Sequence, residues 1–130
     1  MRNLLTLSAL AIAAVLTCRQ HASVGQELLP LSGTIVNGIR VVDIRADRAS
    51  VSPLVIVVAQ GERVRLVIHS RDIIHSLRVD AQGVDVTISP GATARVDLRA
   101  DQSGQFAMVW NACCSPDWPA LGQLVVLSAQ

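Results

Sequence analysis

Alternation of apolar and polar residues dominates the sequence from Thr34 onward, and it is the pattern of half-buried β-strands. One segment differs, because 54–58 is continuously apolar, which indicates a strand buried on both sides or in the core of a sandwich. Turn signals such as Ser89-Pro90-Gly91 separate the segments. Eight segments are expected to be strands: 39–45, 54–58, 63–69, 73–79, 84–88, 94–99, 105–110 and 122–127.

Seven or eight short strands, with turns roughly every 8–12 residues, predict an all-β fold, either a β-sandwich or a small barrel. Val and Ile together number 27 of the 130 residues, which favours strands over helices. The chain is 51% hydrophobic and 16% charged, which excludes a disordered protein. The sequence shows no internal repeat and no amphipathic helix of any length.

The N-terminus has the pattern of an export signal. Arg2 precedes about 13 largely apolar residues, a run of signal-peptide length that is too short to span a bilayer. We interpret residues 1–22 as a signal peptide, 23–33 as a linker and 34–130 as one domain. An uncleaved anchor is the alternative. The protein is therefore expected to be exported and periplasmic, or tethered outside the cytoplasm, touching the membrane only through its N-terminus.

The apolar run ends at a cysteine that is a candidate for lipidation. The segment Val15-Leu16-Thr17-Cys18 resembles a bacterial lipobox, which implies that Cys18 becomes the lipidated first residue. The residue before that cysteine is normally Gly, Ala or Ser, and Thr17 departs from the motif. Cleavage without lipidation therefore remains open beside lipidation.

Charge and missing residue types exclude several function classes. A formal net charge of +1 argues against a nucleic-acid partner. All 11 basic residues are Arg, so there is no lysine for a P-loop or for Schiff-base chemistry. The hydroxyl residues and glycines form no nucleophile elbow or phosphate loop, and the aspartates lie at turns or exposed strand positions. The sequence does not predict an enzyme.

Chemically distinctive side chains gather late in the chain. Both cysteines of the mature protein and all three aromatic residues lie between positions 106 and 118. Of the three histidines, His75 follows a strand-connecting loop. Thiolate and imidazole together suit copper or zinc, although a tetrahedral site requires four ligands. Export would place Cys113 and Cys114 in an oxidising compartment.

Several motifs, in order and with close spacing, resemble one family. They are Gly61-Glu62-x-Val64, Asp72-Ile73-Ile74-His75-Ser76-Leu77, Val84-Asp85-Val86, Pro90-Gly91 and Gly104-Gln105-Phe106. From about Ser52 to Leu127 the chain resembles the cupredoxin domain of cytochrome c oxidase subunit II and of nitrous oxide reductase. The resemblance implies a Greek-key β-sandwich of cupredoxin type. It also implies that His75 occupies the position of a histidine that ligates the binuclear purple-copper centre.

The late loop departs from the family pattern. Cys114 stands at the second of the family's two cysteine positions, so the resemblance retains His75 and Cys114 as ligands. The other ligand positions carry different residues: Trp110 for the first cysteine, Trp118 or Asp117 for the histidine, and Leu121 or Ala120 for the methionine. Because the purple centre needs two bridging thiolates, it should not form within one chain.

Cys113 is an addition to the family pattern, and three interpretations of it compete. It joins His75 and Cys114 in a copper site, with Asp117 as a fourth ligand. Alternatively, Cys113 and Cys114 form a vicinal disulfide that acts as a redox switch. In the third interpretation, one thiol is buried and the other lies at the surface.

We therefore expect an exported cupredoxin-like protein that binds copper and acts in electron transfer or copper delivery in the cell envelope. One Cu(I) ion is favoured over a binuclear centre, and the expected partner is a respiratory or copper-handling protein. The alternative is a metal-free interaction module that has lost its copper site and binds another protein through its Trp-bearing loop. The oligomeric state is left open.

Overall fold

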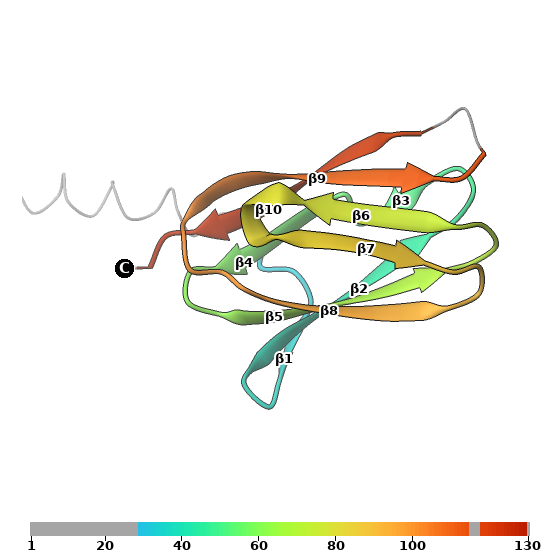
Figure 1. Ribbon diagram of the computed structural model, residues 1–130. Coiled ribbons are helices and arrows are strands. Elements are labelled where there is room, and N and C mark those ends of the chain that lie inside the picture. The colour runs from blue at the N-terminus through green and yellow to red at the C-terminus, as the bar shows by residue number, and fades with distance from the viewer. Residues whose placement is uncertain (1–28, 115–117, 130) are drawn as a thin grey trace, which may run out of the picture. The chain divides into compact units, whose positions relative to one another are not determined.

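The computed structural model describes residues 29–114 and 118–129 (Figure 1). The predicted signal, Cys18 and Asp117 lie outside these residues. One compact unit spans Leu31–Gln130. Its strands are β1 (Thr34–Val36), β2 (Ile39–Ala46), β3 (Val51–Ser52), β4 (Val55–Ala59), β5 (Arg63–Ser70), β6 (His75–Val79), β7 (Val84–Ile88), β8 (Thr93–Arg99), β9 (Gly104–Ala112) and β10 (Ala120–Leu127), with a 3-10 turn, η1 (Asp80–Gln82).

The strands form two sheets packed face to face. The first sheet has the order β1-β2-β5-β8, with β3 paired to β2, and the second has the order β4-β10-β9-β6-β7 (Figure 1). Strands β2 and β5 are parallel, as are β4 and β10, and the other pairs are antiparallel. The predicted all-β sandwich is therefore confirmed. Within the described residues, no helix is long and apolar enough to cross a membrane.

The structure has ten strands where seven or eight were expected, because two short strands, β1 and β3, flank β2. Strand β1 returns to β2 through Asn37 and Gly38, whose φ angles are both positive, at 50° and 79°. Two such residues make the tight hairpin turn that Asn-Gly pairs favour. The Asn-Gly pair was a local signal for a hairpin that the hydrophobic pattern did not reveal.

The core lies between the sheets and follows the predicted alternation. Strand β5 buries Val64, Leu66 and Ile68, each with an exposed fraction of 1% or less, while Arg63 and His69 face solvent. Burying side chains of this size stabilises the fold by about 1.5–3 kcal/mol each. Strand β9 contributes Met108 and Trp110, both fully buried, to the opposite wall.

The continuously apolar segment 54–58 corresponds to β4, which is an edge strand of the second sheet. Ile56 and Val58 point into the core, whereas Val55 is 52% exposed, so burial on both sides does not hold for the whole strand. Val57 is buried as well, and its backbone is hydrogen-bonded to Ser32. The Ser32 amide donates to the Val57 carbonyl at 2.7 Å, and the Val57 amide donates to Ser32 Oγ at 2.8 Å.

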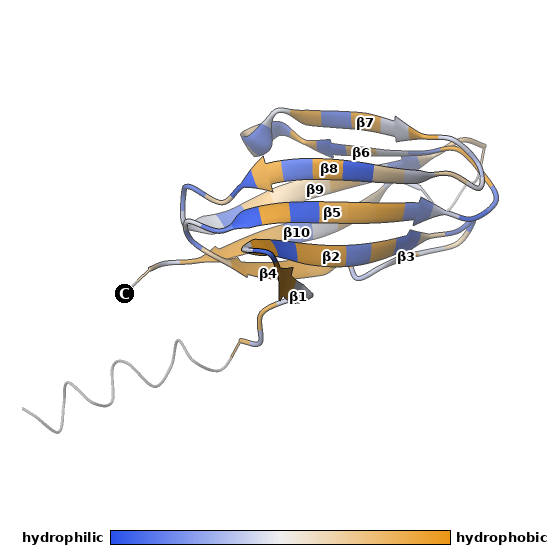
Figure 2. Ribbon diagram, turned by 90° about the horizontal axis from the view of Figure 1, so that it is seen from below, coloured by the Kyte–Doolittle hydropathy of each residue, from blue (hydrophilic) through white to orange (hydrophobic). Residues whose placement is uncertain are grey.

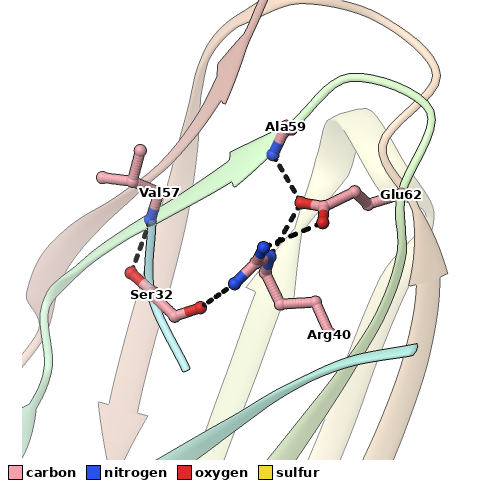
Figure 3. Close-up of polar contacts among 5 residues, drawn as sticks. All are labelled: Ser32, Arg40, Val57, Ala59 and Glu62. Carbon is pink, nitrogen blue, oxygen red and sulfur yellow. Dashed lines mark hydrogen bonds and ion pairs between the residues drawn. The ribbon is translucent and has the colours of Figure 1, made fainter. Parts of the chain in front are cut away.

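A buried ion pair connects Ser32 to both sheets (Figure 3). Arg40 of β2 donates to both carboxylate oxygens of Glu62, at 2.7 and 2.9 Å, and to the Ser32 carbonyl at 2.7 Å. The Ala59 amide of β4 donates to Glu62 Oε1 at 2.7 Å. Because the Arg40 side chain is only 8% exposed, this pair supplies the charge neutralisation that its burial requires.

Candidate metal site

His75 is a fully buried histidine at one end of the sandwich. It is the first residue of β6 and pairs with Ala112 of β9 and Ile88 of β7. Its exposed fraction is 0% because alternation along β6 turns His75, Leu77 and Val79 toward the core. The C-terminal ends of β2, β5, β7 and β9 all lie at this end, which we call the loop end (Figure 1).

One ring nitrogen of His75 makes a hydrogen bond to the protein, and the other makes none within the described residues. Nε2 lies 2.8 Å from the Asp47 carbonyl oxygen, which can only accept a hydrogen bond. Burial lowers the pKa of His75, and Asp72 and Asp47 offset that effect only in part, so the ring is held neutral with a single proton. That proton therefore sits on Nε2. Nδ1 keeps its lone pair and has no hydrogen-bond partner among the described residues.

Trp118 covers the imidazole of His75. The two ring centroids are 5.2 Å apart and the ring planes meet at 89°, an edge-on contact. The indole Nε1 of Trp118 donates to the Arg48 carbonyl at 2.9 Å. Trp118 is therefore partly buried against the domain.

The turn 47–50 holds both rings through its backbone. Asp47 Oδ1 accepts hydrogen bonds from the amides of Ala49 and Ser50, each at 2.9 Å, which fixes the turn and lowers the pKa of Asp47. The turn thus presents the carbonyls of residues 47 and 48 to His75 and Trp118. Sequence reasoning missed these acceptors. The Asp-x-x-Ser spacing signals such a turn but does not indicate what its carbonyls contact.

Cys113 and Cys114 form a vicinal disulfide, which is the second of the three interpretations. The Cys113 amide donates to the Ile74 carbonyl at 2.9 Å and so extends the β6–β9 pairing by one residue. Because Ala112 shares the inward face with His75, alternation sends the Cys113 side chain to the solvent side. Both cysteines are exposed. While the disulfide is intact, neither sulfur is a thiolate.

The described residues at the remaining ligand positions have no side chain that binds copper. Trp110 is fully buried in the core, and its Nε1 has no partner among the described residues. Leu121 is 71% exposed, and Ala120 packs against the core. Within residues 29–114 and 118–129, no three His, Cys, Asp or Glu side chains form a group able to hold a metal ion.

His75 and the two cysteines offer donor atoms that suit copper only when the disulfide is reduced. Nδ1 of His75 is a buried nitrogen donor without a partner, and its other nitrogen donates to a carbonyl, the arrangement typical of metal-ligating histidines. The sulfur donors become ligands only when the disulfide is reduced. A site built from His75, Cys113 and Cys114 would suit a soft ion, but it requires both reduction of the disulfide and a rearrangement of residues 113–114 that brings their sulfurs to the inward face.

Two facing, mainly antiparallel sheets with a buried histidine at the loop end define a β-sandwich of cupredoxin type. The family model for the periplasmic domain of cytochrome c oxidase subunit II matches residues 36–121, about two thirds of the chain. The chain belongs to this family. A comparison with curated proteins gives no match.

Solved structures share the fold at low sequence identity. A copper binding protein in the apo form has 19% identity and a TM-score of 0.60, over 75% of this chain and 97% of that chain. The metal binding domain of the Cu(I) exporting P-type ATPase CopA of Streptococcus pneumoniae D39 has 15% identity and a TM-score of 0.61, over 74% and 93%. The periplasmic domain of cytochrome oxidase subunit II (CoxB) of Bradyrhizobium japonicum has 16% identity and a TM-score of 0.58, over 68% and 83%.

Proposed function

We propose that the protein is an exported copper-binding module that holds one Cu(I) ion through His75 Nδ1 and the thiolates of Cys113 and Cys114. The observation that carries the proposal is the buried Nδ1, which has a lone pair and no protein partner. A nitrogen and two soft sulfurs suit Cu(I) better than the hard cations. When bound, the ion would supply one-electron exchange or a transferable copper ion.

The proposal requires the disulfide to open first. A dithiol reductant passes two electrons and two protons to the Cys113–Cys114 bond and becomes a disulfide itself, which leaves two thiols in the protein. His75 needs no corresponding change, because Nδ1 is already deprotonated in the neutral ring. Copper uptake therefore depends on the redox state of the cysteine pair.

Export and partners belong to the same proposal. The apolar N-terminal run and the family's periplasmic domain support a location outside the cytoplasm. We assign the protein an accessory role, either electron transfer or copper delivery to a respiratory or copper-handling protein of the cell envelope. Catalysis of its own forms no part of the assignment.

Cu(I) affinity tests the proposal directly. Reduced protein is titrated without oxygen against a chromogenic Cu(I) chelator, and one ion per chain is expected. His75→Gln, Cys113→Ser and Cys114→Ser should each weaken binding by at least about tenfold, which corresponds to about 1.4 kcal/mol. His69→Gln is the matched control, because His69 is exposed on β5 and its ring nitrogens lie against the side chains of Thr93 and Asp43.

Two results would reject the copper proposal. Equal Cu(I) affinity in His75→Gln and wild type, with both proteins folded by circular dichroism, would remove His75 from the site. No binding by wild type in either redox state would favour the metal-free interaction module instead.

A further inference from the structure

The outer face of the first sheet carries an excess of positive charge. Register aligns Arg45 with His69 and Thr93 across β2, β5 and β8, and it aligns Asp43 with Val67 and Arg95 one row further along. Five arginines stand on this face against two aspartates: Arg45, Arg63, Arg65, Arg95 and Arg99 against Asp43 and Asp97. Figure 2 shows the hydrophilic positions of these strands lying side by side. The excess is local, because the whole chain is nearly neutral.

Three arginines near the loop end have no ion pair within the described residues, and Arg63 at the opposite end has none either. Toward the opposite end, Arg65 pairs with Asp97 at 2.8 Å and Arg99 pairs with Asp101 at 3.2 Å. Among the described residues, no carboxylate oxygen lies within 4.0 Å of the guanidinium nitrogens of Arg45, Arg71 or Arg95. Their donors therefore remain available to an external acceptor.

A recess of about 690 Å³ lies between these cations. It is lined by Arg45, Ala46, Asp47, His69 and Arg71. The Asp47 carboxylate is engaged by the amides of its own turn. The neighbouring Asp43 carboxylate lies 3.4 Å from His69 Nε2, and His69 Nδ1 lies 3.0 Å from Thr93 Oγ1. Asp47 keeps its negative charge and is attracted to Arg71, but no carboxylate oxygen of the described residues lies within 4.0 Å of either guanidinium group.

We propose that this basic surface, formed by Arg45, His69, Arg71 and Arg95, is the docking site for an acidic segment of a partner protein. Guanidinium groups bind carboxylates in a bidentate manner, and a recess between two of them admits a protruding Asp or Glu side chain. None of the large hydrophobic side chains exposed on the domain belongs to the outer face of β2, β5 or β8. The apolar side chains on this face, Ile39, Val41 and Val67, are only partly exposed, which disfavours insertion into a membrane.

The docking site and the candidate metal site share one residue, Asp47. Asp47 lines the recess, and its carbonyl accepts the hydrogen bond from His75 Nε2. A partner bound to Arg45 and Arg71 would therefore lie next to Asp47, the residue that holds the candidate metal histidine. The docking proposal itself does not depend on copper.

The test uses metal-free protein and a synthetic hexaglutamate peptide, followed by amide chemical shifts. At about 20 mM salt, where screening is weak, the largest shifts are expected at Arg45, Ala46, His69 and Arg71, and binding should weaken at least about tenfold at 300 mM. Arg45→Gln and Arg71→Gln should each weaken binding about threefold or more. Arg78→Gln is the matched control, because it removes the same charge from the opposite sheet.

Three results would overturn the docking proposal. The peptide fails to bind at low salt, or Arg78→Gln weakens binding as much as Arg45→Gln does. In the third, anionic phosphatidylglycerol vesicles bind through Arg45 and Arg71 while hexaglutamate does not, which would assign the face to a membrane. Because no copper is present, none of these results bears on the Cu(I) titration.

Discussion

At the scale of single residues, His75 is the unusual feature of the domain. A buried acceptor without a partner costs a protein about 1–3 kcal/mol, and His75 Nδ1 is such an acceptor within the described structure. The neighbouring Nε2 is fully satisfied by the Asp47 carbonyl. The imidazole is therefore held in one orientation with one nitrogen left open, and a bound ion would offset the cost of leaving it open.

The ligand set predicts the colour of the protein with Cu(II). The visible bands of cupredoxins need Cu(II) held by a cysteine sulfur with two imidazoles or a second bridging thiolate. The proposed ligand set has one imidazole and, after reduction of the disulfide, two adjacent thiols. The two thiolates are expected to reduce two Cu(II) ions to two Cu(I) ions while forming one disulfide. Reduced protein given Cu(II) should therefore show neither stable blue nor stable purple absorption, and a Cu(I) chelator should recover two ions per disulfide formed.

A persistent purple spectrum would contradict that expectation. It would mean that a second chain supplies the missing thiolate across a two-fold axis. Sedimentation of the coloured species would reveal the dimer.

At the scale of elements, the ion pair between Arg40 and Glu62 ties Ser32, β2 and β4 together (Figure 3). Its members come from positions far apart in the sequence, and the Arg40 side chain is 8% exposed. The exposed pair between Arg65 and Asp97 has the same chemistry at the surface. Burial is the main difference between the two pairs, so they make a matched comparison.

Replacing Glu62 by Ala should lower the free energy of unfolding by roughly 3 kcal/mol, because it leaves Arg40 buried and unpaired. Asp97→Ala, at the exposed pair, should cost less than about 1 kcal/mol. Urea denaturation of both variants measures the difference. Equal losses in the two variants would show that burial of the Arg40–Glu62 pair adds nothing.

The same pair predicts acid sensitivity. The hydrogen bonds from Arg40, together with the amide of Ala59, hold the pKa of Glu62 below its ordinary value of 4.5. A depressed carboxyl pKa stabilises the fold fully above the unfolded-state pKa, and this stabilisation is lost as the pH falls through the folded-state pKa. Wild-type stability should therefore decline below about pH 4.5 more steeply than that of Glu62→Ala. Parallel pH profiles would contradict this role.

At the scale of the whole molecule, the fold was largely predictable and the site only in part. Strict alternation over 63–69 and 84–88 predicted strands that the structure confirms. The Asp-Ile-Ile-His motif identified His75 as a candidate ligand, because the motif is a run of neighbouring residues that can be read directly from the sequence. The choice between Nδ1 and Nε2 depends on the Asp47 carbonyl in the turn after β2, 28 residues away in the sequence, and no local pattern encodes that contact. The edge position of β4 depends likewise on its long-range pairing with β10.

Export concerns the whole chain, and the intact mass of the expressed protein tests it. In bacterial cells that express the full chain, the envelope fraction should contain a product shortened by about 22 residues, or one that begins at an acylated Cys18. The first product would be released and the second tethered. Recovery of the whole 13.8 kDa chain from the cytoplasmic fraction alone would contradict export.

The protonation state of the two ring nitrogens of His75 tests most directly the claim that Nδ1 is a free copper ligand. Long-range proton–nitrogen correlation spectra of the reduced protein distinguish a protonated ring nitrogen from one that carries a lone pair. We predict that His75 shows Nε2 protonated and Nδ1 free, and that one equivalent of Cu(I) shifts Nδ1 while Nε2 stays protonated. A proton on Nδ1 before copper is added, or an Nδ1 signal that Cu(I) leaves unchanged, would contradict the account.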